Sequence, residues 1–422
     1  MSGLKVAGPR GADDILPGTV EAWQRVEATM RSLLARYGFS EIRTPMFEHT
    51  DLFQRGVGED TDVVAKEMYT FTDRGGRSVT LRPEGTAGVV RAWLEHGMHA
   101  GAQPTKLGYV SAPMFRYDRP EAGRYRQFHQ MGVEVLGAAS PMADAEVIAV
   151  AHALIADTGL KGAVARLNSV GDGACRPAYR EALRRYYAPH LETLCADCRV
   201  RYERNPLRLL DCKKASCTPL VAGAPSTLDA LCAECAEHFA GVQAFLAAAD
   251  VPLEVDPGIV RGLDYYTRTV FEVAHPTLGA LCGGGRYDGL VEELGGPPTP
   301  AVGFALGVER LLLAAREAGV ERPAEGGVDV FLVCPSDDLR PDVFRTVMAW
   351  RGAGLMAEAD LMGRSFRAQM RHADRIGARY AGVLGAEEKA HGTVSLRDMA
   401  SGGQEEVPGG EAAAWLLARL RP

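Results

Sequence analysis

The chain has 422 residues, of which 46% are hydrophobic and 24% are charged, proportions typical of globular proteins and unlike those of disordered or fibrous ones. Its length predicts two to four domains, at about 150 residues each. The formal net charge of −7 excludes a generally basic protein that coats nucleic acid, so any contact with nucleic acid must be local. No apolar run reaches the ~18 residues of a membrane span, and the first residues lack the apolar segment of a signal peptide.

The first part of the chain mixes helix and strand patterns. Apolar residues at helical spacing predict a helix from about Val20, which Gly38 ends. A strand is expected from Phe39 to Phe47, where Pro45 indicates an edge or interface position. Further strands are expected at Ser78–Leu81, Thr105–Tyr109, Met114–Arg116 and Tyr125–Leu136, and a helix at Met142–Thr158.

The composition changes near Asp172, where cysteines and arginines become frequent, and this block is interpreted as an insertion. Strand patterns resume near Ile259 and continue at Thr269–Val273 and Ala280–Cys282, before an apolar helix at about Gly307–Ala318. The breaker-rich stretch GVERPAEGG then indicates a linker, and alternating strands and helices from Val328 predict a small α/β domain. The expected segments are a core in two parts at 1–172 and 251–324, an insertion at 173–250 and a C-terminal domain at 325–422.

Four segments place polar groups at strand-like positions. In the first, RPEGT, the carboxylate of Glu84 and the hydroxyl of Thr86 suit an ammonium group, although Glu84 at a helix N-terminus explains the pattern as well. In the second, four arginines fall between Arg116 and Arg126, and arginine binds phosphate bidentately. The strand that follows alternates at period two, which predicts a shared functional face. A face that only contacts solvent is the alternative. The residues on this face are Arg126, Phe128, Gln130 and Glu134.

The third segment is RGLDYYTRTVFE, which starts at Arg261, and the fourth is GGGRYDGL, followed by GFALGVERL. Glycines allow a backbone to approach a ligand closely, but a bare glycine cluster is more often a turn. Together the four segments resemble the histidyl-tRNA synthetases, a family of class II aminoacyl-tRNA synthetases. FRYDRPEAGRYRQFHQ is similar to their motif 2, GFALGVERL to motif 3, and the helix and strand around Pro45 to motif 1. RGLDYYTRTVFE and GGGRYDGL resemble the two histidine-specific signatures.

This resemblance implies an α+β catalytic core with a mixed or antiparallel sheet, a small, mostly helical inserted domain and a C-terminal α/β anticodon-binding domain. Glu84 and Thr86 would contact the α-amino group of histidine, with Gln130 nearby. Glu134 and Tyr266 would bind the imidazole nitrogens. The implied histidine site is Glu84, Gly85, Thr86, Arg116, Gln130, Glu134, Arg261, Tyr265 and Tyr266, the implied ATP site is Arg116, Arg124 and Arg310, and Arg116 and Arg261 are the implied catalytic residues.

The implied activity is the ATP-dependent activation of L-histidine to histidyl-adenylate and its transfer to the 3′ end of tRNA(His). ATP would enter with Mg²⁺, Arg261 would neutralise the α-phosphate where other class II enzymes use a metal ion, and motif 1 would form a homodimer in the cytoplasm. One departure is Glu121, where the family often has Gln, in the loop that approaches the tRNA acceptor end.

Two other classes of protein share parts of this pattern. A non-catalytic, histidine-binding regulatory paralogue of histidine biosynthesis keeps the fold but lacks the C-terminal domain. Arg116, Arg261 and Arg310 favour the enzyme over this paralogue. A synthetase for another amino acid is disfavoured by Glu134 and by the Tyr265–Tyr266 pair.

Two patterns lie outside the catalytic segments. The arginines from Arg364 to Arg379 recur three or four residues apart, which predicts a basic stripe along one helical face for RNA or a solvated face. Six of the nine cysteines also cluster, and their two C-x2-C pairs have the spacing of zinc knuckles. A structural zinc site and reduced buried thiols remain alternatives for Cys195, Cys198, Cys212, Cys217, Cys232 and Cys235.

Overall fold

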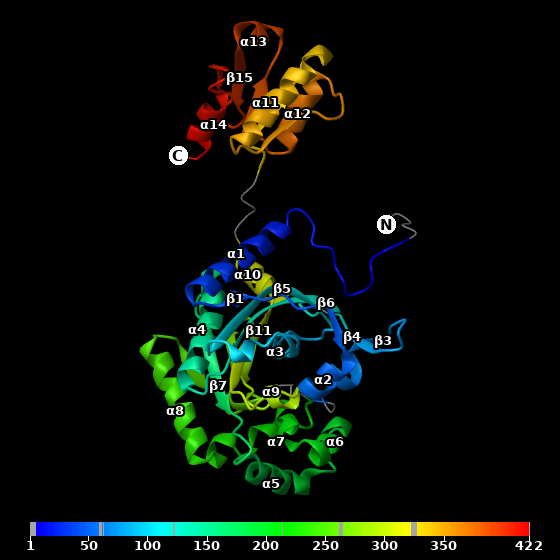
Figure 1. The fold of residues 1–422 in the computed structure, drawn as a ribbon, viewed down its shortest axis with the longest axis vertical. Helices are drawn as coiled ribbons and strands as arrows, with labels where there is room; N and C mark the ends of the chain where they lie inside the picture. Colours follow the sequence, from blue (N-terminus) through cyan, green and yellow to red (C-terminus); the bar gives the residue numbers. More distant parts are fainter. Residues whose placement is uncertain are drawn as a thin grey trace. The chain divides into compact units, whose positions relative to one another are not determined.

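The computed structural model describes residues 6–58, 61, 63–120, 123–212, 214–260, 265–321 and 327–421. The chain forms two compact units, which are Met1–Pro323 and Ala324–Pro422 (Figure 1). Among the described residues, no helix is both long enough and apolar enough to span a membrane.

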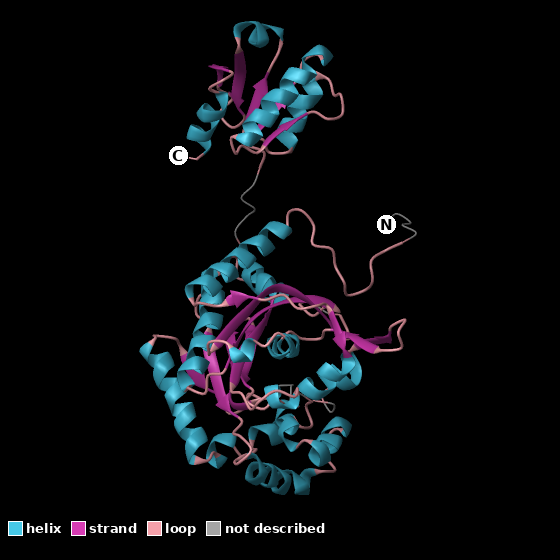
Figure 2. Ribbon diagram, viewed as in Figure 1, coloured by secondary structure: helices cyan, strands magenta, loops and turns pink. Residues whose placement is uncertain are grey.

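An eight-stranded mixed sheet forms the centre of the first unit (Figure 2). All neighbouring strands are antiparallel except the outermost pair at each edge, β1 with β5 and β7 with β8. This arrangement confirms the predicted fold class. The strands in spatial order are β1 Ser40–Glu41, β5 Thr105–Phe115, β6 Gln127–Leu136, β11 Ala301–Gly307, β10 Gly279–Arg286, β9 Thr267–His275, β7 Val164–Ser169 and β8 Leu253–Val255.

The alternation of side chains along β6 shows how this sheet separates packing from chemistry. Met131, Val133 and Val135 point to one face, where they join the main hydrophobic core, whereas Gln130 and Glu134 point to the other because strand side chains alternate. Four helices pack on this face and share that core with side chains from the other strands, and α3 packs against the opposite face. The helices are α1 Val20–Arg36, α4 Pro141–Asp157, α8 Ala233–Ala248 and α10 Val308–Glu317, with α3 at Thr86–Glu95.

The single strand predicted from Phe39 to Phe47 is wrong. The chain leaves β1 after Glu41 and forms a loop, because the Arg82 guanidinium binds the backbone carbonyls of Thr44 and Pro45 at 2.9 and 3.3 Å. It then enters a separate three-stranded sheet in the order β2-β4-β3. The elements here are β2 Phe47–His49, α2 Thr50–Val57, β3 Tyr69–Thr72, β4 Ser78–Leu81 and α9 Leu290–Glu293.

The cysteine-rich region is mostly helical, as expected, and it has a small hydrophobic core of its own around Tyr179, Leu183 and Leu209. Its last helix, α8, instead packs on the main core through Phe239 and Val242. The remaining helices of this region are α5 Arg176–Tyr187, α6 Ala196–Arg204 and α7 Thr218–Ala222.

The second unit is an α/β domain with a five-stranded sheet in the order β13-β12-β14-β15-β16. The predicted arginine stripe is shorter than expected, because α12 covers only Phe366–Arg375. Arg364 precedes this helix and pairs with Asp360 at 2.7 Å, and Arg379 lies beyond it. The elements are β12 Val330–Val333, α11 Arg340–Gly352, β13 Ala357–Ala359, α12, β14 Tyr380–Val383, α13 Ala386–His391, β15 Thr393–Asp398, β16 Gln404–Pro408 and α14 Ala412–Leu420.

Candidate active site

Glu84 lies in the turn between β4 and α3, where its carboxylate covers the start of the helix. One oxygen accepts the backbone N–H of Thr86 at 2.7 Å and the other that of Ala87 at 2.9 Å. The side chain is buried, and this burial raises its pKa although both hydrogen bonds oppose the shift. Glu84 therefore covers the helix N-terminus, as one explanation of the RPEGT segment expects, and its carboxylate also interacts electrostatically with Arg116.

Glu134 is the most deeply buried carboxylate of the site, with no exposed surface. Its Oε1 accepts the hydroxyl hydrogen of Thr86 at 2.7 Å, and the hydroxyl of Tyr287 donates to Oε2. Burial raises the pKa of Glu134 to about 8, against the effect of these two hydrogen bonds. Tyr287 was not among the predicted site residues, although it stands in the GGGRYDGL segment.

Glycines on β10 and β11 make room for these side chains. A Cβ atom at Gly303 would lie 1.8 Å from Oε2 of Glu134, and one at Gly285 would lie 2.8 Å from Cδ1 of Tyr266. Contacts this short are not found between real atoms, so both positions require glycine. The glycines expected to admit a ligand thus admit the side chains of the site.

Aromatic rings close the site beside Glu134. The Tyr265 ring centroid lies 4.7 Å from that of Tyr266 and 5.4 Å from that of Tyr287, and all three side chains are buried. Tyr109 on β5 is a further ring that the sequence reasoning missed. It faces the same site, because a Cβ at Gly85 would lie 2.8 Å from its Cζ, and burial raises its pKa, with Glu134 adding to the shift. Its signal in the sequence is only its place on an alternating strand.

Arg116 follows β5 directly and brings a cation near the buried carboxylate of Glu84. Its Nε donates to the carbonyl of Pro83 at 2.9 Å, and its guanidinium lies 5.6 Å from the Phe128 ring centroid. Burial lowers its pKa, whereas Glu67 and Glu84 act in the opposite direction.

Gln130 is a polar group that the surrounding protein leaves unsatisfied. Its Oε1 is buried and has no hydrogen-bond partner among the described residues. Because buried polar atoms are normally paired, this oxygen favours a polar ligand on the face that also carries Glu134.

Three predicted residues lie apart from this cluster or outside the described residues. Arg124 is largely exposed and pairs with Asp118 at 3.3 Å. Its positive charge nevertheless contributes to the lowered pKa of Arg116. The Arg310 guanidinium donates to the backbone carbonyls of Ala280 and Leu278 at 2.6 and 3.4 Å. Arg261 lies outside the described residues, and so does Glu121.

The two C-x2-C pairs do not meet in one site. Cys195 and Cys198 approach Cys212 and Cys217, whereas Cys232 and Cys235 approach Asp172 and Cys175. Spacing along the chain could not reveal this division, because either pair can be completed by residues from elsewhere in the fold.

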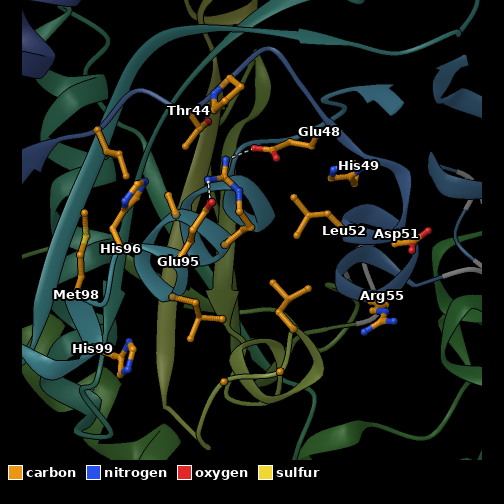
Figure 3. Close-up of a pocket in the computed structure, with 18 of the residues that line it drawn as sticks. Thr44, Glu48, His49, Asp51, Leu52, Arg55, Glu95, His96, Met98 and His99 are labelled. Atoms are coloured by element: carbon orange, nitrogen blue, oxygen red, sulfur yellow. Dashed lines mark hydrogen bonds and ion pairs between the residues drawn. The ribbon is translucent and has the colours of Figure 1, made fainter. Parts of the chain in front are cut away.

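A broad hollow lies beside the loop that contains Pro45, with a volume of about 1220 Å³. Arg91 is among its lining residues, and it donates to Glu95 at 2.9 Å and pairs with Glu48; Figure 3 labels both of these acidic side chains. Met46 and Phe47, next to Pro45, are more than half exposed. This face therefore combines apolar and charged groups, as interfaces between proteins do.

Comparison with known proteins decides the family. A family model described as "Histidyl-tRNA synthetase" matches residues 11–311, and one described as "Anticodon binding domain" matches residues 329–419. The chain belongs to the histidyl-tRNA synthetase family. Histidine--tRNA ligases from Desulfitobacterium hafniense and Geobacillus thermodenitrificans are 53% and 50% identical to it, over 96% and 98% of both chains in each comparison. The apo histidyl-tRNA synthetase structure from S. aureus is 39% identical, covers 97% of this chain and 99% of its own, and has a TM-score of 0.83.

Proposed function

We propose that this chain activates L-histidine with ATP and transfers it to tRNA(His), and that the cluster around Glu84 and Glu134 is where the activation takes place. The observation that carries the assignment to this cluster is the buried network in which Thr86 and Tyr287 both donate to Glu134. Such a site holds polar groups in fixed directions, and it rejects a substrate that leaves one of them unpaired.

The two acidic side chains suit the two nitrogen-bearing ends of histidine, the α-ammonium group and the imidazole ring. Glu84 would hold the α-ammonium group together with Thr86, since each of its oxygens keeps a lone pair after binding the helix N–H groups. Glu134 and Tyr266 would each bind one imidazole nitrogen. Gln130, whose buried oxygen has no partner among the described residues, would complete the amino-acid pocket, and Tyr265 would line it.

In the first step a carboxylate oxygen of histidine attacks the α-phosphorus of ATP, and pyrophosphate leaves. In the second, a ribose hydroxyl of the tRNA attacks the acyl carbon, and AMP leaves. The protein would accelerate these steps mainly by positioning the reactants and by neutralising the charge on the phosphates. Arg116 and Arg261 would neutralise the α-phosphate, Arg124 and Arg310 would bind the rest of the triphosphate, and Mg²⁺ would accompany ATP.

An exchange assay separates this function from its rivals. The enzyme should incorporate labelled pyrophosphate into ATP with histidine and with no other amino acid. A regulatory paralogue would bind histidine without exchange, and a different synthetase would respond to another amino acid. Either result would overturn the proposal.

The second unit would bind the anticodon arm of the tRNA. Arg367, Arg371 and Arg375 are exposed at four-residue intervals along α12, and therefore share one helical face. A hollow of about 380 Å³ adjoins the first of these arginines and is lined by Phe366, Arg367, Met370, Val383, Glu388, Ser395, Arg397 and Gln404.

We further propose that two copies of this chain pair in the cytoplasm through the face around Pro45. Met46 and Phe47 are 54% and 57% exposed, and β2, to which Phe47 belongs, is an edge strand of its small sheet. Met46→Asp should convert the dimer to a monomer in analytical ultracentrifugation. Met142→Asp, at a similarly exposed position on α4, is the control. Unchanged association of the Met46→Asp variant would refute this interface.

Within the expected insertion at 173–250, we propose one structural zinc ion held by Cys195, Cys198, Cys212 and Cys217. The four sulfur atoms lie within 4.8 Å of one another. The Sγ atoms of Cys195 and Cys212 are 3.9 Å apart, and zinc bound tetrahedrally at about 2.3 Å requires sulfur atoms about 3.8 Å apart. This zinc would fasten α6 to the small core around Tyr179 and take no part in catalysis.

A further inference from the structure

A second group of potential metal ligands lies between the inserted helices and the catalytic sheet. It consists of Asp172, Cys175, Cys232 and Cys235, whose ligand atoms all lie within 4.8 Å of one another. Three thiolates and a carboxylate are a ligand set for zinc, which prefers four tetrahedral ligands of this kind. We propose that these four residues bind a second zinc ion, which holds the segment carrying Tyr265 and Tyr266 in place.

The spacing of the ligands fits that ion. The Sγ of Cys175 lies 3.6 Å from Oδ1 of Asp172. Tetrahedral zinc with bonds of about 2.3 Å to sulfur and about 2.0 Å to oxygen requires a separation of about 3.5 Å. All cysteines are free in this structure, so no disulfide removes a ligand from the group.

The same short sequence motif occurs at both groups of potential ligands. Residues 194–198 read LCADC and residues 231–235 read LCAEC. In each copy the first cysteine is the N-cap of a helix in extended conformation, Cys195 at φ −64° and ψ 161° before α6, and Cys232 at φ −69° and ψ 165° before α8. Each second cysteine lies in the first helical turn, so each pair presents two sulfur atoms on one side. The sequence similarity and the matching dihedral angles indicate that the pairs have the same use.

Backbone N–H groups already point at the second ligand group. Cys232 donates its N–H to the Sγ of Cys175 at 3.1 Å, and Ala174 donates its N–H to Oδ1 of Asp172 at 3.0 Å. The N-termini of α5 and α8 meet here, since Cys175 and Cys232 are their N-caps. Backbone N–H groups and the positive ends of two helix dipoles therefore converge on this ligand group, where they would offset part of its negative charge.

The ligands are also connected to the start of β9, the strand that follows Tyr266 of the proposed histidine site. Nη2 of Arg268 donates to Oδ2 of Asp172 at 3.4 Å, and the backbone N–H of Arg268 donates to the carbonyl of Gly171 at 2.8 Å. Arg176, the residue after Cys175, donates to the carbonyl of Tyr266. A metal ion at Asp172 and Cys175 would therefore hold two contacts at the start of β9, that of Arg176 with Tyr266 and that of Asp172 with Arg268.

Arg268 adds backbone strain to this junction. Its φ is +52°, in the left-handed region that residues other than glycine rarely adopt, so surrounding contacts must hold it there. Ligands of a bound metal are commonly held by hydrogen bonds from residues outside the ligand set, as Arg268 holds Asp172 here. Loss of such an outer residue typically lowers metal affinity or activity 10- to 100-fold. Loss of the second zinc should thus act on histidine binding through Tyr266, which makes Asp172 and its partners positioning residues.

Metal analysis of the full-length protein tests the proposal. The wild type should contain two zinc ions per chain by plasma mass spectrometry. Cys232→Ser/Cys235→Ser should contain one, and so should the matched Cys195→Ser/Cys198→Ser variant. Cys334→Ser, a control in the second unit, should contain two. Two zinc ions in the Cys232→Ser/Cys235→Ser variant would overturn the proposal. A wild type with one zinc, lost only with Cys195 and Cys198, or with none, would also overturn it.

Two further variants separate the metal from the ion pair and from misfolding. Asp172→Cys keeps four ligands but removes the contact with Arg268, so it should retain two zinc ions, whereas Asp172→Asn should lose one to a chelator. In pyrophosphate exchange, Cys232→Ser/Cys235→Ser should raise the KM for histidine about tenfold and that for ATP much less. An unchanged KM for histidine in a folded variant with one zinc would contradict the positioning role. If the double variant does not fold, the wild-type zinc content and the two Asp172 variants still decide the case.

Discussion

Glu134→Gln gives a direct test of how the candidate site is built, because it removes the titratable proton of a buried group with little change in shape. Burial raises the pKa of Glu134 from 4.5 to about 8. The folded protein therefore keeps a proton on this group up to about pH 8, whereas the unfolded chain loses it above about pH 4.5. Unfolding releases that proton, so the contribution to stability is largest below pH 4.5 and falls as the pH rises towards 8.

The size of the effect follows from the pH interval between the pKa of Glu134 in the unfolded chain and its pKa in the folded protein. Each pH unit between the two pKa values is worth roughly 1.4 kcal/mol, so wild-type stability should fall relative to Glu134→Gln by roughly 3 kcal/mol from pH 5.5 to pH 7.5. In a unit of about 320 residues, at roughly 2 cal/mol/K per residue, this is a change of about 4 °C in the difference between the two Tm values.

Differential scanning calorimetry of the ligand-free proteins measures this difference. Glu317→Gln is the matched control, since Glu317 is exposed near the end of α10, and its Tm difference from the wild type should stay constant with pH. A constant Tm difference for Glu134→Gln between pH 5.5 and 7.5 would show that the carboxylate is already ionised in the folded protein. The inference that Glu134 is protonated in the folded protein would then be wrong.

The remaining predictions concern the phosphate and tRNA contacts. Arg261→Lys should slow adenylate formation by on the order of 10²–10³, because lysine supplies a charge without the planar fork, while transfer from preformed adenylate and the KM for histidine change much less. Single-turnover kinetics of the two half-reactions checks this, and near-normal activation would exclude the phosphate-neutralising role. Ending the chain after Gly326 should spare histidine-dependent pyrophosphate exchange and strongly weaken aminoacylation. Normal tRNA charging by the truncated protein, shown to be folded by circular dichroism, would refute the role of the second unit.

The sequence predicts those features of the fold that depend on local patterns. The helix from Val20 and the strand at β4 follow from local sequence patterns, and the structure has them at Val20–Arg36 and Ser78–Leu81. The strand predicted through Pro45 fails because Arg82, distant in the sequence, binds the loop carbonyls. Such a contact leaves no periodic signal.

The candidate site shows the same limit. Glu84, Thr86 and Glu134 stand out in the sequence because polar groups at strand-like positions are unusual, and the structure brings them together. Tyr109 escapes notice because a tyrosine on a strand is ordinary. Tyr287 follows β10 directly, in a segment that the sequence marks without giving this residue a role, and only the fold shows that both side chains face Glu134. The division of the cysteines into two groups likewise depends on where α5 and α7 bring Cys175 and Cys217, which spacing cannot reveal.

The structure of this chain with a non-hydrolysable analogue of histidyl-adenylate tests the central claim most directly. The ammonium group should lie within hydrogen-bond distance of Glu84 and Thr86, the imidazole nitrogens should contact Glu134 and Tyr266, and the phosphate should contact Arg116 and Arg261. An analogue bound with its imidazole away from Glu134, or with its phosphate away from both arginines, would contradict the account.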